Sequence, residues 1–364
     1  MSAQGVLHAR SPFYIKVSNG SLSYAVMKLY VYDGVLTTDK PATPQYTITK
    51  KEVSDNNYVV FEISELVRDF ITNQINMQTV WVETDITLYN SLDAPLTTAS
   101  QDNKGFDGYG YFRDGTNPNH LSALMISNSI IYKQDSSTKK IPISVDKASN
   151  VCYYNKIGPA VSGDWETSEE IWNTSEELWS SYELISCDTI TQSTDSDLKI
   201  KYVTIPAAAE RVVVDGAYVF EVKNVCEPKY NPKEVLFTNK FGATQRITFF
   251  KKSKENLNVK KESYKANTFN ESSLSYSTQD HQFKSFNING KESITMNTGF
   301  VDESFNAVIR ELLLSESVWV VDGVYTLPLI PKTSSVEYKT VLNDKLLNYT
   351  IDFDYAFDKI NDIR

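Results

Sequence analysis

The side chains that could do acid–base, metal or nucleophilic chemistry are scattered along this 364-residue chain. The three histidines, His8, His120 and His281, lack metal-ligand spacing such as H-E-x-x-H, so loop or strand-end positions account for them. The chain has neither a G-x-S-x-G nucleophile motif nor a phosphate-binding lysine loop. A carboxylate pair for glycoside cleavage stays open, because its members need not be close in sequence. The sequence therefore indicates no enzyme and predicts no metal or cofactor.

A polar segment at residues 91–119, rich in Asp, Asn and Gly, predicts a long loop. Its glycines reverse the order of the dinucleotide-binding fingerprint and begin no helix. The oxygen-bearing side chains lack the regular spacing of an EF-hand loop; they are Asp102, Asn103, Asp107 and Asp114. Aromatic rings in such a loop can stack on a sugar or on a protein partner. The candidate partner-binding residues are Tyr109, Tyr111 and Phe112, unless the loop packs on its own domain.

A second candidate surface is the repeat T-S-E-E-I-W followed by T-S-E-E-L-W, which begins at residue 167. It places Trp165, Trp172 and Trp179 seven residues apart, so on a helix the three rings would form one stripe. Tryptophan is enriched at the energetic centres of interfaces. The stripe either binds a partner or docks on the chain's own β-structure. We expect residues 158–197 to form a Trp- and Glu-rich connector.

Composition and charge narrow the class of protein. Apolar residues make up 41% of the chain, and 22 tyrosines and 17 phenylalanines favour strands. The formal net charge is −10, which argues against a protein that binds the phosphates of nucleic acid. The one cluster of cations is diluted by Glu255 and Glu262; it comprises Lys251, Lys252, Lys254, Lys260, Lys261 and Lys265.

The cysteines are few and widely spaced. An odd count without a C-x-x-C pair argues against a disulfide framework, so Cys152, Cys187 and Cys226 are predicted to be buried thiols in a reducing cytoplasm. Residues 1–10 contain no apolar signal core, and no apolar run has membrane-spanning length. We therefore expect no membrane association.

The elements that must position these residues are mostly strands. Residues 22–32 and 79–89 alternate between apolar and polar side chains. A short helix is expected at 64–71 with Ser64 as its N-cap. These elements predict an N-terminal β-sandwich domain over residues 1–157 that carries the loop at 91–119.

The second half, residues 198–364, is expected to be a β-rich domain. Three dipeptides suited to tight turns predict hairpins, at Asp215-Gly216, Asn289-Gly290 and Asp322-Gly323. Apolar spacing predicts one helix near 302–314, capped by Asp302. The predicted fold class is therefore mainly β with a minor α+β character, in two or more β-sandwich-like domains with short helices.

Three segments of the C-terminal third are similar to segments of bacteriophage tail and virion structural proteins, of the kind found in phages of Bacteroidota. They are VLFTNKFGATQRITFFKKS at 235–253, LLLSESVWVVDG at 312–323 and VLNDKLLNYTIDFDYA at 341–356. Residues 11–15 and 61–70 resemble these proteins more loosely. The resemblance covers about residues 235–363 and leaves out the tryptophan repeat.

This resemblance implies a non-enzymatic structural subunit of a tail, baseplate or neck ring, made and assembled in the host cytoplasm and located in the virion. Its partners would be other virion tail proteins and further copies of itself in a ring, since heterologous contacts around an axis close into rings. One alternative is a receptor- or carbohydrate-binding adhesin module that touches a host surface glycan. A virion-associated glycan-degrading enzyme is the other.

Overall fold

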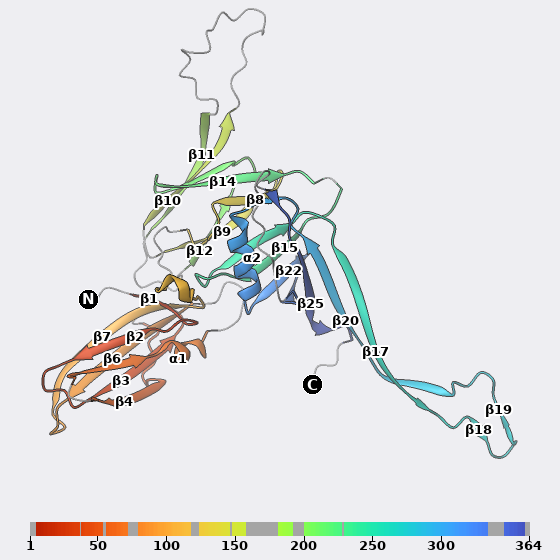
Figure 1. Cartoon of the computed structure of the whole chain (residues 1–364), viewed down its shortest axis with the longest axis horizontal. Coiled ribbons are helices and arrows are strands. Elements are labelled where there is room, and N and C mark those ends of the chain that lie inside the picture. The colour runs from red at the N-terminus through yellow and green to blue at the C-terminus, as the bar shows by residue number, and fades with distance from the viewer. Residues whose placement is uncertain are drawn as a thin grey trace, which may run out of the picture. The chain divides into compact units, whose positions relative to one another are not determined.

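A computed structural model describes residues 5–36, 38–53, 56–71, 79–117, 124–145, 148–157, 181–191, 200–227, 229–333 and 346–360. Of these residues 57% lie in strands and 6% in helices, which confirms a mainly β fold with several sheets and short helices (Figure 1). The chain divides into two compact units. Unit 1 comprises Met1–Cys226, Leu236–Ile247 and Ser304–Glu316, and unit 2 comprises Glu227–Val235, Thr248–Glu303 and Ser317–Arg364.

The first part of unit 1 contains a five-stranded sheet and a two-stranded sheet around one apolar core. The alternating pattern of the sequence places one face of each strand in this core, where Met27, Phe61 and Val82 are fully or almost fully buried. In sheet order, the larger sheet is β1 (Gly5–His8), β7 (Pro95–Phe106), β6 (Thr79–Tyr89), β3 (Tyr24–Tyr32) and β4 (Tyr46–Lys51), and the smaller one is β2 (Tyr14–Ser18) and β5 (Tyr58–Glu62).

The short helix of this part is α1 (Ser64–Arg68), which ends three residues before the predicted end. The prediction that Ser64 is the N-cap is wrong, because Ile63 occupies that position and makes no side-chain cap bond. Both the backbone N–H and the hydroxyl of Ser64 donate instead to Oε1 of Glu62. Ser64 is thus the first residue of the helix, and its hydroxyl is bonded to the last residue of β5.

The second part of unit 1 repeats this arrangement with a five-stranded and a two-stranded sheet. Their shared core includes Ile143, Tyr153, Val203 and Val212. In sheet order, the strands are β11 (Ser181–Ile190), β10 (Ser149–Ile157), β13 (Arg211–Val214), β14 (Tyr218–Val225) and β8 (Ile130–Gln134) in the larger sheet, and β12 (Ile200–Ile205) and β9 (Lys139–Ser144) in the smaller one.

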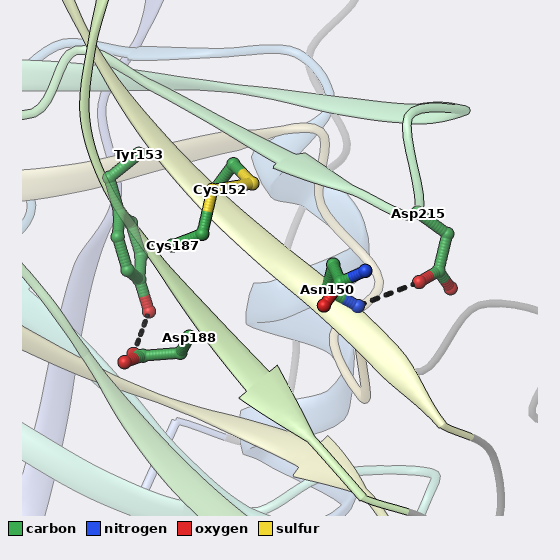
Figure 2. Close-up of a disulfide and its surroundings, with 6 residues drawn as sticks. All are labelled: Asn150, Cys152, Tyr153, Cys187, Asp188 and Asp215. Carbon is green, nitrogen blue, oxygen red and sulfur yellow. Dashed lines mark hydrogen bonds between the residues drawn. A yellow bond between two sulfur atoms is a disulfide. The ribbon is translucent and has the colours of Figure 1, made fainter.

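The predicted hairpin at Asp215-Gly216 is confirmed, since β13 and β14 pair and both turn residues have positive φ, 54° and 66°. The carboxylate of Asp215 also accepts a 2.9 Å hydrogen bond from the backbone N–H of Asn150 on β10 (Figure 2). This aspartate therefore joins the turn to the neighbouring strand.

Cys152 and Cys187 form a disulfide between β10 and β11, which corrects the prediction of three buried thiols (Figure 2). The two residues are direct partners in the antiparallel register, with their Cα atoms 4.0 Å apart. Cys226 is a free thiol and is exposed. An odd cysteine count does not prevent one bridge, because strand register alone places two cysteines side by side.

The two units differ from the segments expected from the sequence. β12, β13 and β14 pair with β9, β10 and β8, so residues 200–226 belong to unit 1 and not to a domain that starts at 198. Part of the expected connector is β11, paired with β10. The parts of that connector at residues 158–180 and 192–197 lie outside the described residues.

Unit 2 contributes strands to a seven-stranded sheet. In its core the rings of Phe249 and Phe353 meet edge to face with centroids 6.1 Å apart, beside Ile294 and Ile351. The strands in sheet order are β16 (Thr244–Phe249), β15 (Lys233–Thr238), β22 (Val318–Asp322), β23 (Tyr325–Pro331), β25 (Thr350–Asp358), β20 (Phe283–Asn297) and β17 (Lys254–Lys265). Unit 2 also contains two short two-stranded sheets. They are β18 (Phe269–Asn270) with β19 (Ser275–Tyr276) and β21 (Val301–Asp302) with β24 (Leu346–Leu347).

Two of the three remaining local predictions need correction. The helix is α2 (Phe305–Leu314), with Ser304 at its N-cap position, whereas Asp302 lies two residues earlier, in β21. Asn289-Gly290 forms no hairpin, because both residues lie within the 15-residue strand β20, which pairs with β17 and β25. The hairpin at Asp322-Gly323 is confirmed as the connection of β22 to β23.

Candidate interaction sites

The predicted loop at 91–119 is largely a strand, which corrects the sequence interpretation. Residues 95–106 are β7, which pairs with β6 on one side and with β1 on the other. Its N-terminal half is polar because most of those side chains are exposed, whereas its last four residues are buried. Only residues 107–117 remain as a described connecting segment, which includes a 3₁₀ turn at Phe112–Asp114.

Tyr109 lies inside unit 1, with 7% of its surface exposed. Its backbone N–H donates a 2.8 Å hydrogen bond to the carbonyl oxygen of Lys240 in the turn between β15 and β16. The guanidinium of Arg10 lies 4.8 Å from the centre of its ring, and the ring of Tyr111 meets it edge to face at 5.7 Å. Burial raises the pKa of the Tyr109 hydroxyl above its ordinary value. Tyr109 therefore holds segments of its own unit together and offers no ring to a partner.

Glycines allow this close contact between the two segments. A Cβ atom added to Gly108 would lie 2.6 Å from the carbonyl oxygen of Lys240, and one added to Gly242 would lie 2.8 Å from the backbone nitrogen of Asp107. Gly242 also has φ of 78°, a conformation that side-chain-bearing residues rarely adopt. The Gly-rich sequence after β7 thus reflects close backbone packing.

Charged side chains surround this contact. Asp107 is buried, and its desolvation raises the pKa of its carboxyl to about 6, against the attraction of Arg10 and Arg68. Arg68 and Arg10 both pair with Glu316, the latter at 3.6 Å. The cluster joins segments that are distant in sequence, so its evident role is structural.

Tyr111 and Phe112 differ from Tyr109 and from each other. Tyr111 is partly buried, with the guanidinium of Arg310 5.5 Å from its ring centre. Phe112 is fully exposed, so it is the one of the three candidates that presents its whole ring to a partner. Trp165, Trp172 and Trp179 lie outside the described residues, and their role stays a prediction.

The most exposed apolar surface lies elsewhere, on the ribbon formed by β17 and the first half of β20. Figure 1 shows this ribbon continuing beyond β25 and ending in β18 and β19. We call residues 254–290 the arm. All twelve residues of β17 are exposed, as are the first six of β20. The ribbon contains a β-bulge, where Asn287, with φ of 50°, and Ile288 lie opposite Lys261.

The arm carries an excess of exposed apolar side chains. Among the described residues 26 large apolar side chains are exposed, and nine of them belong to the arm. These nine are Leu257, Val259, Tyr264, Phe269, Leu274, Tyr276, Phe283, Phe286 and Ile288. Clustered apolar exposure of this kind marks sites that bind other molecules. A two-stranded ribbon is also at best marginally stable alone in water.

The charge of the arm differs from that of the rest of the chain. The arm has five lysines and four acidic residues, a formal charge of +1, so the other residues together carry −11. Four of the six lysines in the cluster noted in the sequence lie on β17. The arm was not predicted from the sequence, because Asn289-Gly290 suggested a hairpin there. The mixture of apolar and basic residues at 254–288 was nevertheless a signal of a surface that binds another molecule.

Other kinds of site receive no support in the described part of the chain. There, no three His, Cys, Asp or Glu side chains are grouped so that they could hold a metal ion. No described helix is both long and apolar enough to cross a membrane. No protein-family profile matches the chain, and no curated protein matches its sequence significantly.

Proposed function

We propose that this chain is a non-enzymatic structural subunit of a phage virion, in the tail, baseplate or neck ring, and that its arm binds a second copy of the same chain. The exposed arm is the observation that carries the proposal. The resemblance of residues 235–363 to tail proteins supports it, and the arm falls within that range. Each of the two parts of unit 1 is built from a five-stranded and a two-stranded sheet. Such a framework suits a structural subunit that keeps its neighbours at fixed positions.

The apolar residues of the arm's shaft supply the attraction. Leu257 and Val259 share one side of β17 and are each more than half exposed. The rings of Tyr264 and Phe286 are diagonal neighbours across the ribbon, with centres 5.8 Å apart. Covering such side chains stabilises a complex by about 25 cal/mol for each Å² of apolar surface removed from water. β17 is also the edge strand of its sheet, and an edge strand can pair with a strand of another molecule.

Charge favours a second copy as the partner. An arm of charge +1 is attracted to the remaining −11 of another molecule, whereas two arms are not attracted to each other. The contact is therefore heterologous, with the arm of one copy on a different surface of the next. Repetition of such a contact around an axis produces a ring.

The adhesin alternative keeps only part of the loop first proposed for it. Tyr109 is buried against Lys240 and Arg10, so it is not available for stacking on a host glycan. Phe112 alone remains exposed there. The described residues offer no observation that favours a glycan-degrading enzyme.

Light scattering of the purified chain tests the proposal. The wild type should form oligomers that weaken as salt is added, because salt screens attraction between exposed charges. The double variant Lys260→Glu, Lys261→Glu should be mainly monomeric, and Leu257→Ser combined with Val259→Ser should weaken association at every salt concentration.

A matched control is Lys140→Glu with Lys201→Glu, since both lysines are exposed on unit 1 and the change in net charge is the same. This control should assemble like the wild type. A wild-type chain that stays monomeric at high concentration and is not incorporated into virions would contradict the proposal.

A further inference from the structure

The arm ends in an open hollow of about 640 Å³. It forms because the two sides of the ribbon part after the backbone N–H of Ala266 donates a 2.7 Å hydrogen bond to the carbonyl oxygen of Gln282. They meet again where Phe269 pairs with Tyr276. Two residues span the gap on one side and five on the other, so the chain encloses a space. Its volume falls within the range of about 300–1,000 Å³ that is typical of sites for small ligands.

The lining of the hollow combines aromatic rings with polar groups. Phe269 and Tyr276 are direct partners across β18 and β19, so their rings share one face, and both are exposed. Asp280 and Gln282 also line the hollow, and both are exposed. Eight of the ten lining residues carry a hydroxyl, an amide or a charge.

We infer that this hollow binds a neutral oligosaccharide, with Phe269 and Tyr276 against the sugar rings and Asp280 and Gln282 bonded to hydroxyl groups. One face of a sugar ring presents C–H groups, which pack on the apolar face of an aromatic side chain. Sugar hydroxyls both donate and accept, so they match a carboxylate, which accepts, and an amide, which does both. The inference goes beyond the proposed role of the arm's shaft.

The charges of the hollow argue against other ligands. Lys265 and Asp280 are its two charged lining residues and cancel each other, so neither a phosphate chain nor a strongly acidic polymer is favoured. A protein anchor would require a mainly apolar pocket at the centre of the contact. The polar lining instead suits a ligand whose surface is largely hydroxyl.

Parts of the tip are already organised without a ligand. The side-chain oxygen of Asn267 accepts a 3.0 Å hydrogen bond from the backbone N–H of Phe269, and the hydroxyl of Ser277 accepts one of 3.2 Å from that of Gln279. These bonds fix the backbone on both sides of the hollow. Less conformational freedom is then lost when a sugar binds.

Saturation-transfer NMR on the full-length chain tests the inference, with maltotriose, cellotriose, chitotriose and mannotriose as the probes at millimolar concentration. We expect transfer to at least one trisaccharide. Tyr276→Ala should weaken that binding about tenfold, since a lost stacking contact is worth about 1.4 kcal/mol. Tyr276→Phe should bind like the wild type because it keeps the ring, which also excludes misfolding of the tip as the cause.

Leu274→Asn is the matched control. Leu274 is an exposed apolar residue of the same tip but does not line the hollow, and its φ of 47° suits asparagine. It should leave sugar binding unchanged. The oligomeric mass should be the same in all tip variants, so the failure of this inference is distinguishable from failure of the assembly proposed for the shaft.

Three results would overturn the inference. The first is the lack of transfer to any of the four trisaccharides. The second is transfer that persists in the double variant Phe269→Ala, Tyr276→Ala, which would place the sugar elsewhere. The third is a change of oligomeric mass in Tyr276→Ala without an effect on sugar binding, which would assign the tip to a protein contact.

Discussion

The backbone N–H of Tyr109 donates a 2.8 Å hydrogen bond to the carbonyl oxygen of Lys240, and this bond joins the end of β7 to the turn between β15 and β16. The two residues are 131 positions apart in the sequence. Gly108 and Gly242 let the two backbones approach, and the ring of Tyr109 is covered by Arg10. An aromatic, glycine-rich segment that resembles a binding loop is thereby part of the interior of unit 1.

Replacement of Gly108 by alanine should destabilise the fold by about 1–3 kcal/mol, because the added methyl group overlaps backbone that cannot easily move. The Cβ atom would lie 2.6 Å from the Lys240 carbonyl oxygen. Gly20→Ala is the control, since a Cβ atom added to Gly20 would have no heavy atom within 4 Å. Urea denaturation measures both, and equal stability of Gly108→Ala and the wild type would contradict the proposed contact.

Asp107 should make unit 1 less stable as pH rises from about 4 to about 6. Burial raises the pKa of its carboxyl from 3.8 to about 6, so in this window the folded state binds more protons than the unfolded state. The loss amounts to at most about 3 kcal/mol. Asp107→Asn should remove this slope and raise stability above pH 6. Denaturation at a series of pH values checks it, and a slope that persists in the variant would assign it to another group.

Asn239 should be among the least replaceable polar residues. It is fully buried; its amide nitrogen donates to the carbonyl oxygen of Met125 and to the side chain of Gln245, and its oxygen accepts from the N–H groups of Phe241 and Ala243. Asn239→Ala removes the hydrogen-bond partner of all four groups, so it should lower the free energy of unfolding by about 3–5 kcal/mol.

The variant Asn239→Asp separates the role of the side chain as an acceptor from its role as a donor. It keeps the acceptor of the turn but places a carboxylate beside the Met125 and Gln245 oxygens, so it should destabilise the chain at neutral pH and less so in acid. Thermal unfolding at both pH values measures this. Little effect of either variant would show that Asn239 is not needed in the turn.

Reduction of the Cys152–Cys187 bridge should lower the stability of unit 1 by about 2–4 kcal/mol, because the bridge closes a loop with a sequence separation of 35 residues. The comparison is best made in a Cys226→Ser background, since that exposed thiol could exchange with the bridge. Non-reducing mass spectrometry should show a mass lower than that of the reduced chain by two hydrogen atoms. A chain purified under oxidising conditions with three free thiols would exclude the bridge.

Local features of this fold could be predicted because they depend on a few neighbouring residues. Asp215-Gly216 forms a turn because both residues tolerate positive φ, and the apolar spacing of 305–314 is that of a helix with one buried face. The mainly β class follows in the same way from the alternating segments. Strand alternation is a property of the chain itself, whichever strand becomes the neighbour.

Features that depend on partners distant in sequence were decided by the tertiary structure. Asn289-Gly290 could have turned, but pairing with β17 and β25 keeps β20 continuous through it. Cys152 meets Cys187 only because β10 and β11 take one particular register. Tyr109 is buried only because the turn at Lys240 packs against it. Such contacts are set by strand register and by the packing of segments that lie from tens of residues to more than a hundred residues apart, which no local pattern encodes.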